Sequence, residues 1–251
     1  MEYYQFFIYI LIGFIAQTVD GALGMAYGVC STTFLTAVGV PIRIASASVH
    51  TAEVFTTLVS GISHWKCKNI DFSLFKSLII PGTIGGVLGA YVLVNVSGEA
   101  LTPFIAIYLI IMGFVVIYRA LKGFFLKKFF DYKKVWAVGL IGGFCDAVGG
   151  GGWGPIVTST MLVSSYKTRF VIGTVNTAEF FVTIVQSFTF AVFMGIGDYW
   201  QVILGLAVGG ALAAPLAALV CKRLADKKLT LIVGIFIVVL NTWNILKYFA
   251  G

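Results

Sequence analysis

The sequence predicts an all-α integral membrane protein with an inverted repeat, in which each half is a re-entrant or broken helical hairpin plus three transmembrane helices. Three features predict this fold: an apolar composition, a motif that recurs at a fixed offset, and glycine-rich breaks inside apolar segments. Of the 251 residues, 59% are hydrophobic and 11% are charged, whereas soluble domains carry about 25% charged residues. The chain therefore has no stretch polar enough for a separate soluble domain.

The same composition excludes several classes of protein. The net charge of +7 does not indicate nucleic-acid binding, because membrane proteins concentrate Lys and Arg in cytoplasmic loops. The four cysteines lack the spacing of a zinc site or a disulfide framework. No nucleotide-binding or metalloprotease motif is present, so we expect neither an enzyme nor a cofactor. We expect a multi-pass protein of the cell (inner) membrane in contact with lipid, and the sequence leaves its oligomeric state open, a homo-oligomer included.

The chain repeats itself at an offset of 126 residues. Thr51-Ala52-Glu53-Val54-Phe55 recurs as Thr177-Ala178-Glu179-Phe180-Phe181, and His50 matches Asn176 at the same offset. We therefore divide the chain into a first repeat (1–118), a basic cytoplasmic linker (119–134) and a second repeat of inverted orientation (135–251).

Each repeat begins with a pair of short apolar segments. These segments reach only about 18–23 Å as helices, whereas the hydrocarbon core of a bilayer is about 30 Å thick. The short pairs are 5–19 with 24–38, and 134–148 with 153–164. Three longer segments follow in each repeat, and each is long enough to span: 44–64, 74–95 and 101–119, then 170–194, 200–221 and 229–249.

Glycine-containing breaks, Asp20–Gly24 and Gly149–Gly154, join the two members of each short pair. Four consecutive glycines followed by Pro155 cannot continue a stable helix. Non-helical backbone within a membrane must be buried in protein or line a wet cavity, and transporters often place an ionisable residue at such a break. Glycines that only permit close helix packing are the alternative, and we favour a binding site.

The distribution of the 17 Lys and Arg residues predicts the topology. If each broken segment crosses the membrane, the two sides carry 10 and 7 of them; if each is a re-entrant hairpin, the split is 15 to 2, with Arg43 and Lys247 outside. The positive-inside rule favours the second arrangement, which has six full spans and two re-entrant hairpins.

Ionisable residues at membrane depth are the main candidates for function. An unpaired acid there costs about 2.5–3.5 kcal/mol, so each needs a partner, a proton or a wet cavity. His50 and Glu53 share one helix face, as do Asn176 and Glu179. Two interpretations stay open: the glutamates bond the amides freed at the breaks, or they take part in transport. A metal site is not expected, because His50 is the one histidine available to it.

The hairpin tips are the predicted place for an anion. The returning half-helices start near Met25 and Trp153, and a helix N-terminus favours negative charge. Tyr27 and Trp153 are candidate walls of the pocket. The expected substrate-binding residues are Asp20, Gly24, Tyr27, His50, Glu53, Asp146, Gly150, Gly151, Gly152, Trp153, Asn176 and Glu179.

Four motifs together resemble the TauE/SafE family of membrane permeases, the sulfite exporter family, over essentially the whole chain. The motifs run from Asp20 to Gly28, Ser48 to Glu53, Asp146 to Pro155 and Gly173 to Glu179. The resemblance implies transport of a small anion such as sulfite, thiosulfate or an organosulfonate. The first tip lacks the glycine triplet of the family's motif, which makes the Gly149–Gly154 tip the better candidate for binding.

We therefore expect a secondary transporter for a sulfur oxyanion. Glu53, Glu179 and His50 are candidates to exchange protons and to couple transport to a proton gradient, because desolvation disfavours a charged carboxylate. The alternative is an uncoupled anion channel on the same fold.

Overall fold

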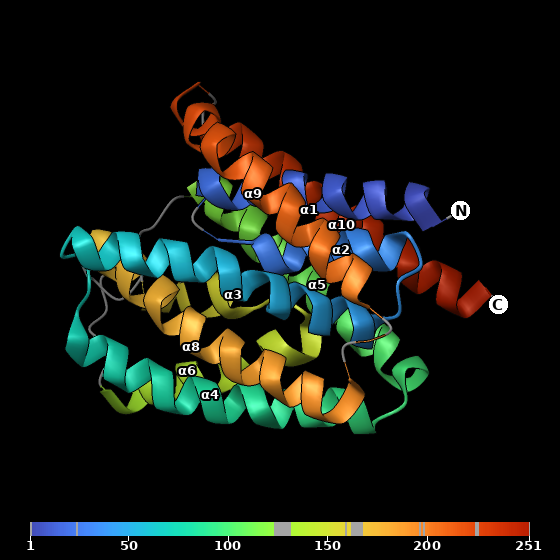
Figure 1. Ribbon diagram of the computed structural model, residues 1–251, viewed down its shortest axis with the longest axis horizontal. Helices are drawn as coiled ribbons and strands as arrows, with labels where there is room; N and C mark the ends of the chain where they lie inside the picture. Colours follow the sequence, from blue (N-terminus) through green and yellow to red (C-terminus); the bar gives the residue numbers. More distant parts are fainter. Residues whose placement is uncertain are drawn as a thin grey trace.

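The structure is a computed structural model that describes residues 2–23, 25–122, 132–158, 160–161, 168–195, 197, 199–223 and 226–250. Within these residues every regular element is a helix, as predicted (Figure 1). The helices are α1 (Glu2–Leu23), α2 (Tyr27–Ala37), α3 (Ile42–Lys66), α4 (Phe72–Asn95), α5 (Gly98–Lys122), α6 (Tyr132–Gly149), the short π-helix η1 (Trp153–Thr158), α8 (Thr168–Met194), α9 (Trp200–Arg223) and α10 (Asp226–Ala250).

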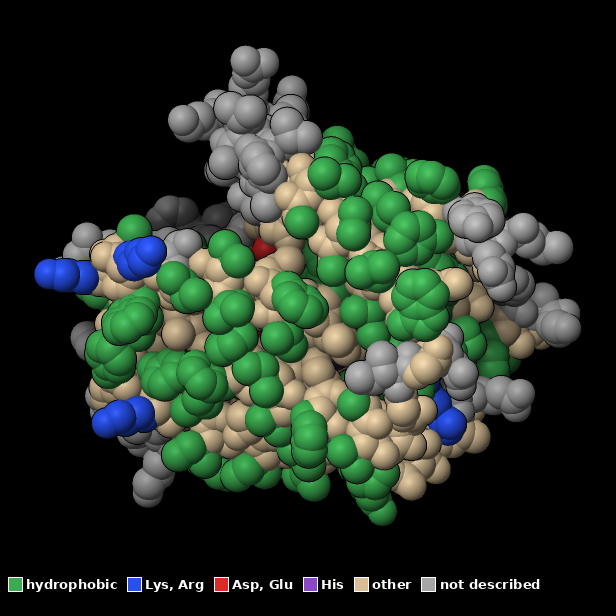
Figure 2. All heavy atoms as spheres, in the orientation of Figure 1, with side chains coloured by type: hydrophobic (Ala, Val, Ile, Leu, Met, Phe, Trp, Pro, Cys, Tyr) green, Lys and Arg blue, Asp and Glu red, His purple; other side chains and the backbone are tan. Residues whose placement is uncertain are grey.

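The surface has the character of a membrane protein. Figure 2 shows hydrophobic side chains over most of the visible face, with Lys and Arg toward the two ends of the long axis. Phe104 and Phe188 are 70% and 69% exposed, which suits contact with lipid. In the described part of the chain, three helices are long and apolar enough to cross a bilayer: Phe72–Asn95, Ala100–Tyr118 and Phe170–Met194.

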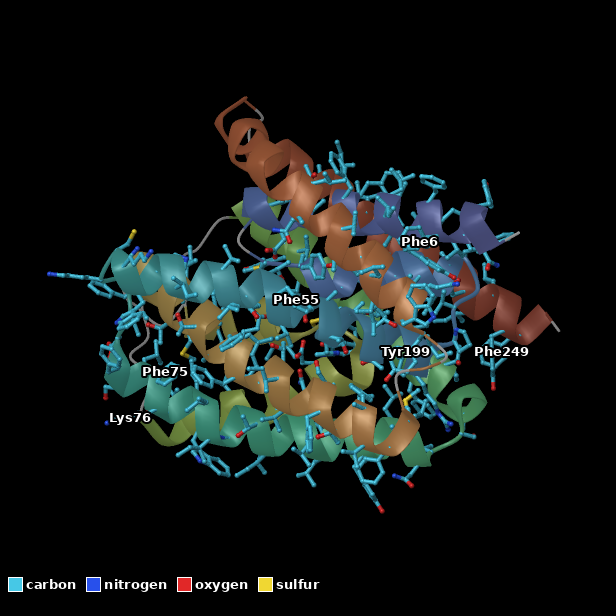
Figure 3. The ribbon with its side chains drawn as sticks, viewed as in Figure 1. Phe6, Phe55, Phe75, Lys76, Tyr199 and Phe249 are labelled. Carbon is cyan, nitrogen blue, oxygen red and sulfur yellow. The ribbon has the colours of Figure 1, made fainter. Side chains whose placement is uncertain are left out.

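Both chain termini lie toward the same end of the long axis (Figure 1). Lys76, near the start of α4, lies toward the opposite end, far from Phe249 (Figure 3). The long helices run broadly along this axis, so the axis is the natural direction of the membrane normal.

The first arm of each hairpin is longer than its apolar segment indicated. The prediction that residues 5–19 form a short half-helix is wrong, because α1 has 22 residues and extends about 33 Å. The helix continues through the polar Asp20 and the residues after it. A length predicted from the run of apolar residues alone is therefore too short. The returning arm α2 is short, with 11 residues. Helix α1 continues to Leu23, through most of the predicted break at Asp20–Gly24, and α2 begins at Tyr27.

The predicted break at the glycine run is confirmed. Helix α6 ends at Gly149, and η1 begins at Trp153. Between them Gly150 has φ 67° and Gly151 has φ 152°. These left-handed values favour glycine, which has no Cβ atom to clash with the backbone.

The two halves of the chain pack into each other. Helix α1 packs against α9, α6 against α4, α3 against α8 and α5 against α10. A Cβ atom built on Gly85 of α4 would overlap the Leu140 carbonyl of α6, and one on Gly209 of α9 would overlap the Ile10 carbonyl of α1. The glycine-rich helix of each half therefore lies directly on the first hairpin arm of the other half.

Candidate functional site

The two hairpin tips meet backbone to backbone. A Cβ atom built on Gly28, in the first turn of α2, would lie 2.7 Å from the Cα atom of Gly151. The Thr32 hydroxyl donates a hydrogen bond to the Gly150 carbonyl, and the Tyr108 hydroxyl donates to the Gly151 carbonyl at 3.1 Å. Only glycine permits this approach, which places both helix breaks at one point in the core.

The Asp146 carboxylate holds the second tip together. Its Oδ1 accepts hydrogen bonds from the backbone amides of Gly152 at 2.7 Å and Trp153 at 3.0 Å. Its Oδ2 accepts from Gln186 Nε2 at 3.0 Å and lies 3.1 Å from His50 Nε2. Two of the amides at the glycine break, those of Gly152 and Trp153, are therefore already bonded to a side chain.

His50 is a structural partner of Asp146 in the buried core. Its Nδ1 lies 2.7 Å from the Ser46 carbonyl, and because a carbonyl oxygen only accepts, Nδ1 carries a proton. The contact between Nε2 and Oδ2 of Asp146 then requires one further proton between these two atoms. This contact joins α3 to the second hairpin.

Asp20 is the counterpart of Asp146 at the same offset, and it holds the first tip more weakly. Its Oδ1 accepts from the Tyr27 amide at 3.3 Å. The aspartates, and not the glutamates, thus bond the amides freed at the breaks, so that interpretation of the glutamates is wrong. Glu53 is 4% exposed, and its Oε2 has no hydrogen-bond partner among the described residues.

A cavity of about 310 Å³ lies where the tips meet. It extends along α3 from Glu53 to His64 and along α8 from Glu179 to Ile172. Both helices run from the tips toward the end of the molecule that carries Lys76. Figure 3 shows side-chain oxygen atoms gathered between α3 and α8 near the middle of the long axis.

Most of the predicted site residues come together in this cavity, and a few do not. Gly24 lies outside the described residues. Trp153 is fully buried, donates its Nε1 hydrogen to the Val175 carbonyl at 3.2 Å and packs against Gly82, so it is a packing residue. His50 and Gly150 are not among the residues that line the cavity. The predicted residues that line the cavity are Asp20, Tyr27, Glu53, Asp146, Gly151, Gly152, Asn176 and Glu179.

Several polar residues of the site were absent from the predicted set. Gln186 lies on the polar stripe that continues from Asn176 and Glu179 at helical spacing, so this stripe was a signal for it. Tyr108 had no such signal, because apolar residues flank it on both sides within α5. The further polar residues that line the cavity are Gln17, Thr56, Thr57, Ser60 and His64.

The side chains that line the cavity carry negative rather than positive charge. Four carboxylates line the cavity: Asp20, Glu53, Asp146 and Glu179. No Lys or Arg side chain is among the described residues that line it. One of the four, Asp146, pairs with His50, and the other three make no ion pair with a described residue.

A polar cavity at two helix breaks, enclosed by apolar helices, is typical of membrane transport proteins. The chain belongs to the family described as sulfite exporter TauE/SafE, which matches residues 9–243. It is therefore a multi-pass membrane transporter and not an enzyme.

Two proteins of Bacillus subtilis (strain 168) are similar to this chain. A probable membrane transporter protein, YtnM, is 39% identical over 247 residues, which cover 96% of this chain and 82% of that protein. A second probable membrane transporter protein, YunE, is 23% identical, with 94% of this chain and 96% of that protein covered. No solved structure matches the chain.

Proposed function

We propose that this protein is a secondary transporter that moves sulfite or a small organosulfur anion across the cell membrane together with protons. The family description supports a sulfur oxyanion as the substrate. The observation that carries the proposal is the cavity at the meeting point of the two hairpin tips, lined by Glu53 and Glu179 and by no Lys or Arg side chain among the described residues.

The charge of the cavity supports coupling to protons. An anion that enters beside ionised carboxylates is repelled, and the repulsion is strong where water is scarce. Protonation of Glu179 would remove this repulsion and would carry a proton with the substrate. Glu179 is half-buried on the cavity wall, where it can meet both the substrate and water.

We propose that residues 1–118 and 135–251 are inverted repeats joined by a basic cytoplasmic linker at 119–134. The packing supports this arrangement, because α1 on α9 mirrors α6 on α4. The matching positions of Asp20 and Asp146, each of which caps a returning half-helix, support it independently.

A carrier fits the packing of the tips better than a continuous channel. The side chains of His50, Gln186 and Phe190 are fully buried beyond the tips, and the cavity extends along α3 and α8 toward the end that carries Lys76. If that basic end is cytoplasmic, as the positive-inside rule requires, the cavity faces inward. In an alternating-access cycle, a second conformation would then open the cavity to the outside.

Uptake into proteoliposomes tests the proposal, with sulfite, thiosulfate and sulfoacetate each measured with and without a pH gradient. We expect saturable uptake with counterflow, and accumulation driven by the gradient. Flux that stays linear in concentration would support the channel instead.

The variant Glu179→Gln tests the coupling. It keeps the shape and hydrogen-bonding capacity of the side chain and removes its titration. We expect this variant to exchange substrate across the membrane but no longer to concentrate it in response to a pH gradient, and Glu53→Gln to show a weaker defect. If Glu179→Gln responds to the gradient like the unmodified protein, Glu179 does not couple transport to protons.

A further inference from the structure

A second cavity lies toward the end of the molecule that holds both termini. We call it the outer cavity, and we call the cavity where the hairpin tips meet the inner cavity. The outer cavity has a volume of about 490 Å³ and lies between the last turn of α2, the start of α5 and the end of α10. Tyr248 on its rim precedes Phe249, which Figure 3 places far from Lys76. Under the proposed topology, this end of the molecule faces outward.

The outer cavity is polar and uncharged. Its rim includes the exposed Gly39, and its floor includes the buried Leu109. No Asp, Glu, Lys or Arg is among the described residues that line it. An anion in the outer cavity therefore meets no carboxylate on these residues, whereas four carboxylates line the inner cavity. The polar residues of the lining are Thr36, Thr102, Asn241, Asn244 and Tyr248.

Helix α2 lines both cavities. Its first turn, from Tyr27 to Val29, lines the inner cavity, and Thr36 and Ala37 at its other end line the outer cavity. Val29 and Thr36 lie two helical turns apart, which is about 10 Å along the helix axis. The barrier between the two cavities is therefore thin.

One part of the barrier is the contact between α2 and the second hairpin tip. Asn241 Nδ2, at the floor of the outer cavity, donates a hydrogen bond to the Thr33 hydroxyl at 3.1 Å. The preceding residue, Thr32, donates its hydroxyl hydrogen to the Gly150 carbonyl. Two adjacent side chains of α2 therefore connect the floor of the outer cavity to the glycine tip.

The other part of the barrier is Tyr108 of α5. Its neighbour Leu109 lines the outer cavity. The Tyr108 hydroxyl donates a hydrogen bond to the Gly151 carbonyl at 3.1 Å, and Gly151 lines the inner cavity. The side chain of Tyr108 therefore reaches from the floor of one cavity to the wall of the other.

We propose that the outer cavity is the outward-facing mouth of the transport route, and that the bonds from Thr32 and Tyr108 to the glycine tip are its closed gate. When these two bonds break, a small anion passes between the outer and the inner cavity. This inference rests on the proposed transport function and adds the position of the outer entrance.

Labelling of single added cysteines tests the outer mouth. Asn244→Cys lies in the outer cavity, and Leu246→Cys lies on the same helix, exposed and outside the lining. Right-side-out vesicles are treated with a membrane-impermeant sulfonated maleimide, and uptake of sulfite, thiosulfate and sulfoacetate is measured after the reagent is removed. We expect treatment to abolish most of the uptake by Asn244→Cys. Leu246→Cys and the unmodified protein, which has four native cysteines, should keep theirs.

Two results would overturn the outer mouth. A cysteine at position 244 that stays unlabelled would mean that water does not fill the cavity. A labelled cysteine that leaves uptake unchanged would mean that the anion enters elsewhere. Ala106→Cys, at the buried floor of the same cavity, repeats the test if Asn244→Cys yields no folded protein.

Thr56→Cys tests the gate, because Thr56 lines the inner cavity and the reagent reaches it from outside only when the gate is open. Adding Tyr108→Phe removes one gate bond and should raise the rate of labelling from outside by about threefold to tenfold. The matched control is Tyr91→Phe, which removes a hydroxyl from an exposed side chain of α4 and should leave the rate unchanged. Equal rates with and without Tyr108→Phe would exclude Tyr108 from the gate.

The measurements separate this inference from the proposed function, because labelling does not require transport. If a sulfur anion is carried and labelling at position 244 does not affect its uptake, the proposed function stands and the outer mouth is wrong. If no sulfur compound is carried by the unmodified protein, the proposed function fails, and the labelling rates alone decide whether the outer cavity leads to the inner one.

Discussion

Asp20 and Asp146 lie 126 residues apart, which is the offset of the repeated sequence motif, yet they make different hydrogen bonds. Asp146 accepts from two amides and from Gln186, and it pairs with His50. Asp20 accepts one long hydrogen bond from the Tyr27 amide. The carboxylate at the second tip therefore takes part in a network, whereas Asp20 makes one long hydrogen bond among the described residues.

This difference predicts unequal effects on stability. Asp146→Asn removes the charge opposite His50 and replaces an acceptor with a donor, so we expect a loss of about 3–5 kcal/mol in the free energy of unfolding. Asp20→Asn should cost about 1 kcal/mol. Unfolding titrations in mixed detergent micelles measure both variants, and equal losses would show that the network around Asp146 adds nothing.

Gly151 is the residue at which the second tip touches the first. A Cβ atom there would overlap the backbone of Gly28 and Val29, and the left-handed φ of Gly151 disfavours any other residue. We expect Gly151→Ala to lower both the yield of folded protein and transport, with a cost of about 1–3 kcal/mol. The matched control is Gly197→Ala, where a Cβ atom has no neighbour within 4 Å. A normal yield of folded Gly151→Ala protein would mean that the tips separate easily.

At the scale of whole helices, close glycine contacts decide which helices pair. Gly85 and Gly89 of α4 face α6, and Gly205 and Gly209 of α9 face α1, so each half of the chain packs tightly on the hairpin of the other half. Close approach of backbones is a main source of helix association in membranes, since lipid supplies no hydrophobic drive between helices.

Two alanine substitutions compare a tight helix contact with an ordinary one. Gly85→Ala should separate α4 from α6 and cost about 1–3 kcal/mol, because its methyl group overlaps the Leu140 carbonyl. Gly61→Ala in α3 should be neutral or stabilising by up to about 1 kcal/mol, since its nearest neighbour would lie 3.6 Å away. Thermal unfolding in detergent distinguishes the two, and similar melting temperatures would argue against tight packing at Gly85.

At the scale of the molecule, the course of the helices predicts which side of the membrane each loop and terminus faces. The N-terminus, residues 41–43 and the C-terminus should face outward, while Cys67, residues 165–169 and residues 222–228 should face the cytoplasm. Labelling of single cysteines in intact and permeabilised cells tests this arrangement. Opposite accessibility for positions 167 and 222 would exclude two re-entrant hairpins.

The sequence by itself determined the helical membrane class and the break at the glycine run. These features depend on local backbone chemistry and on the free energy of transfer into lipid, which act over a few residues. Only the tertiary structure decided that Asp146 bonds the freed amides, that Gln186 and Tyr108 support the second tip, and that α1 extends past Asp20. These contacts join residues far apart in the chain, and their geometry is set by the glycine-mediated approach of helices from opposite halves.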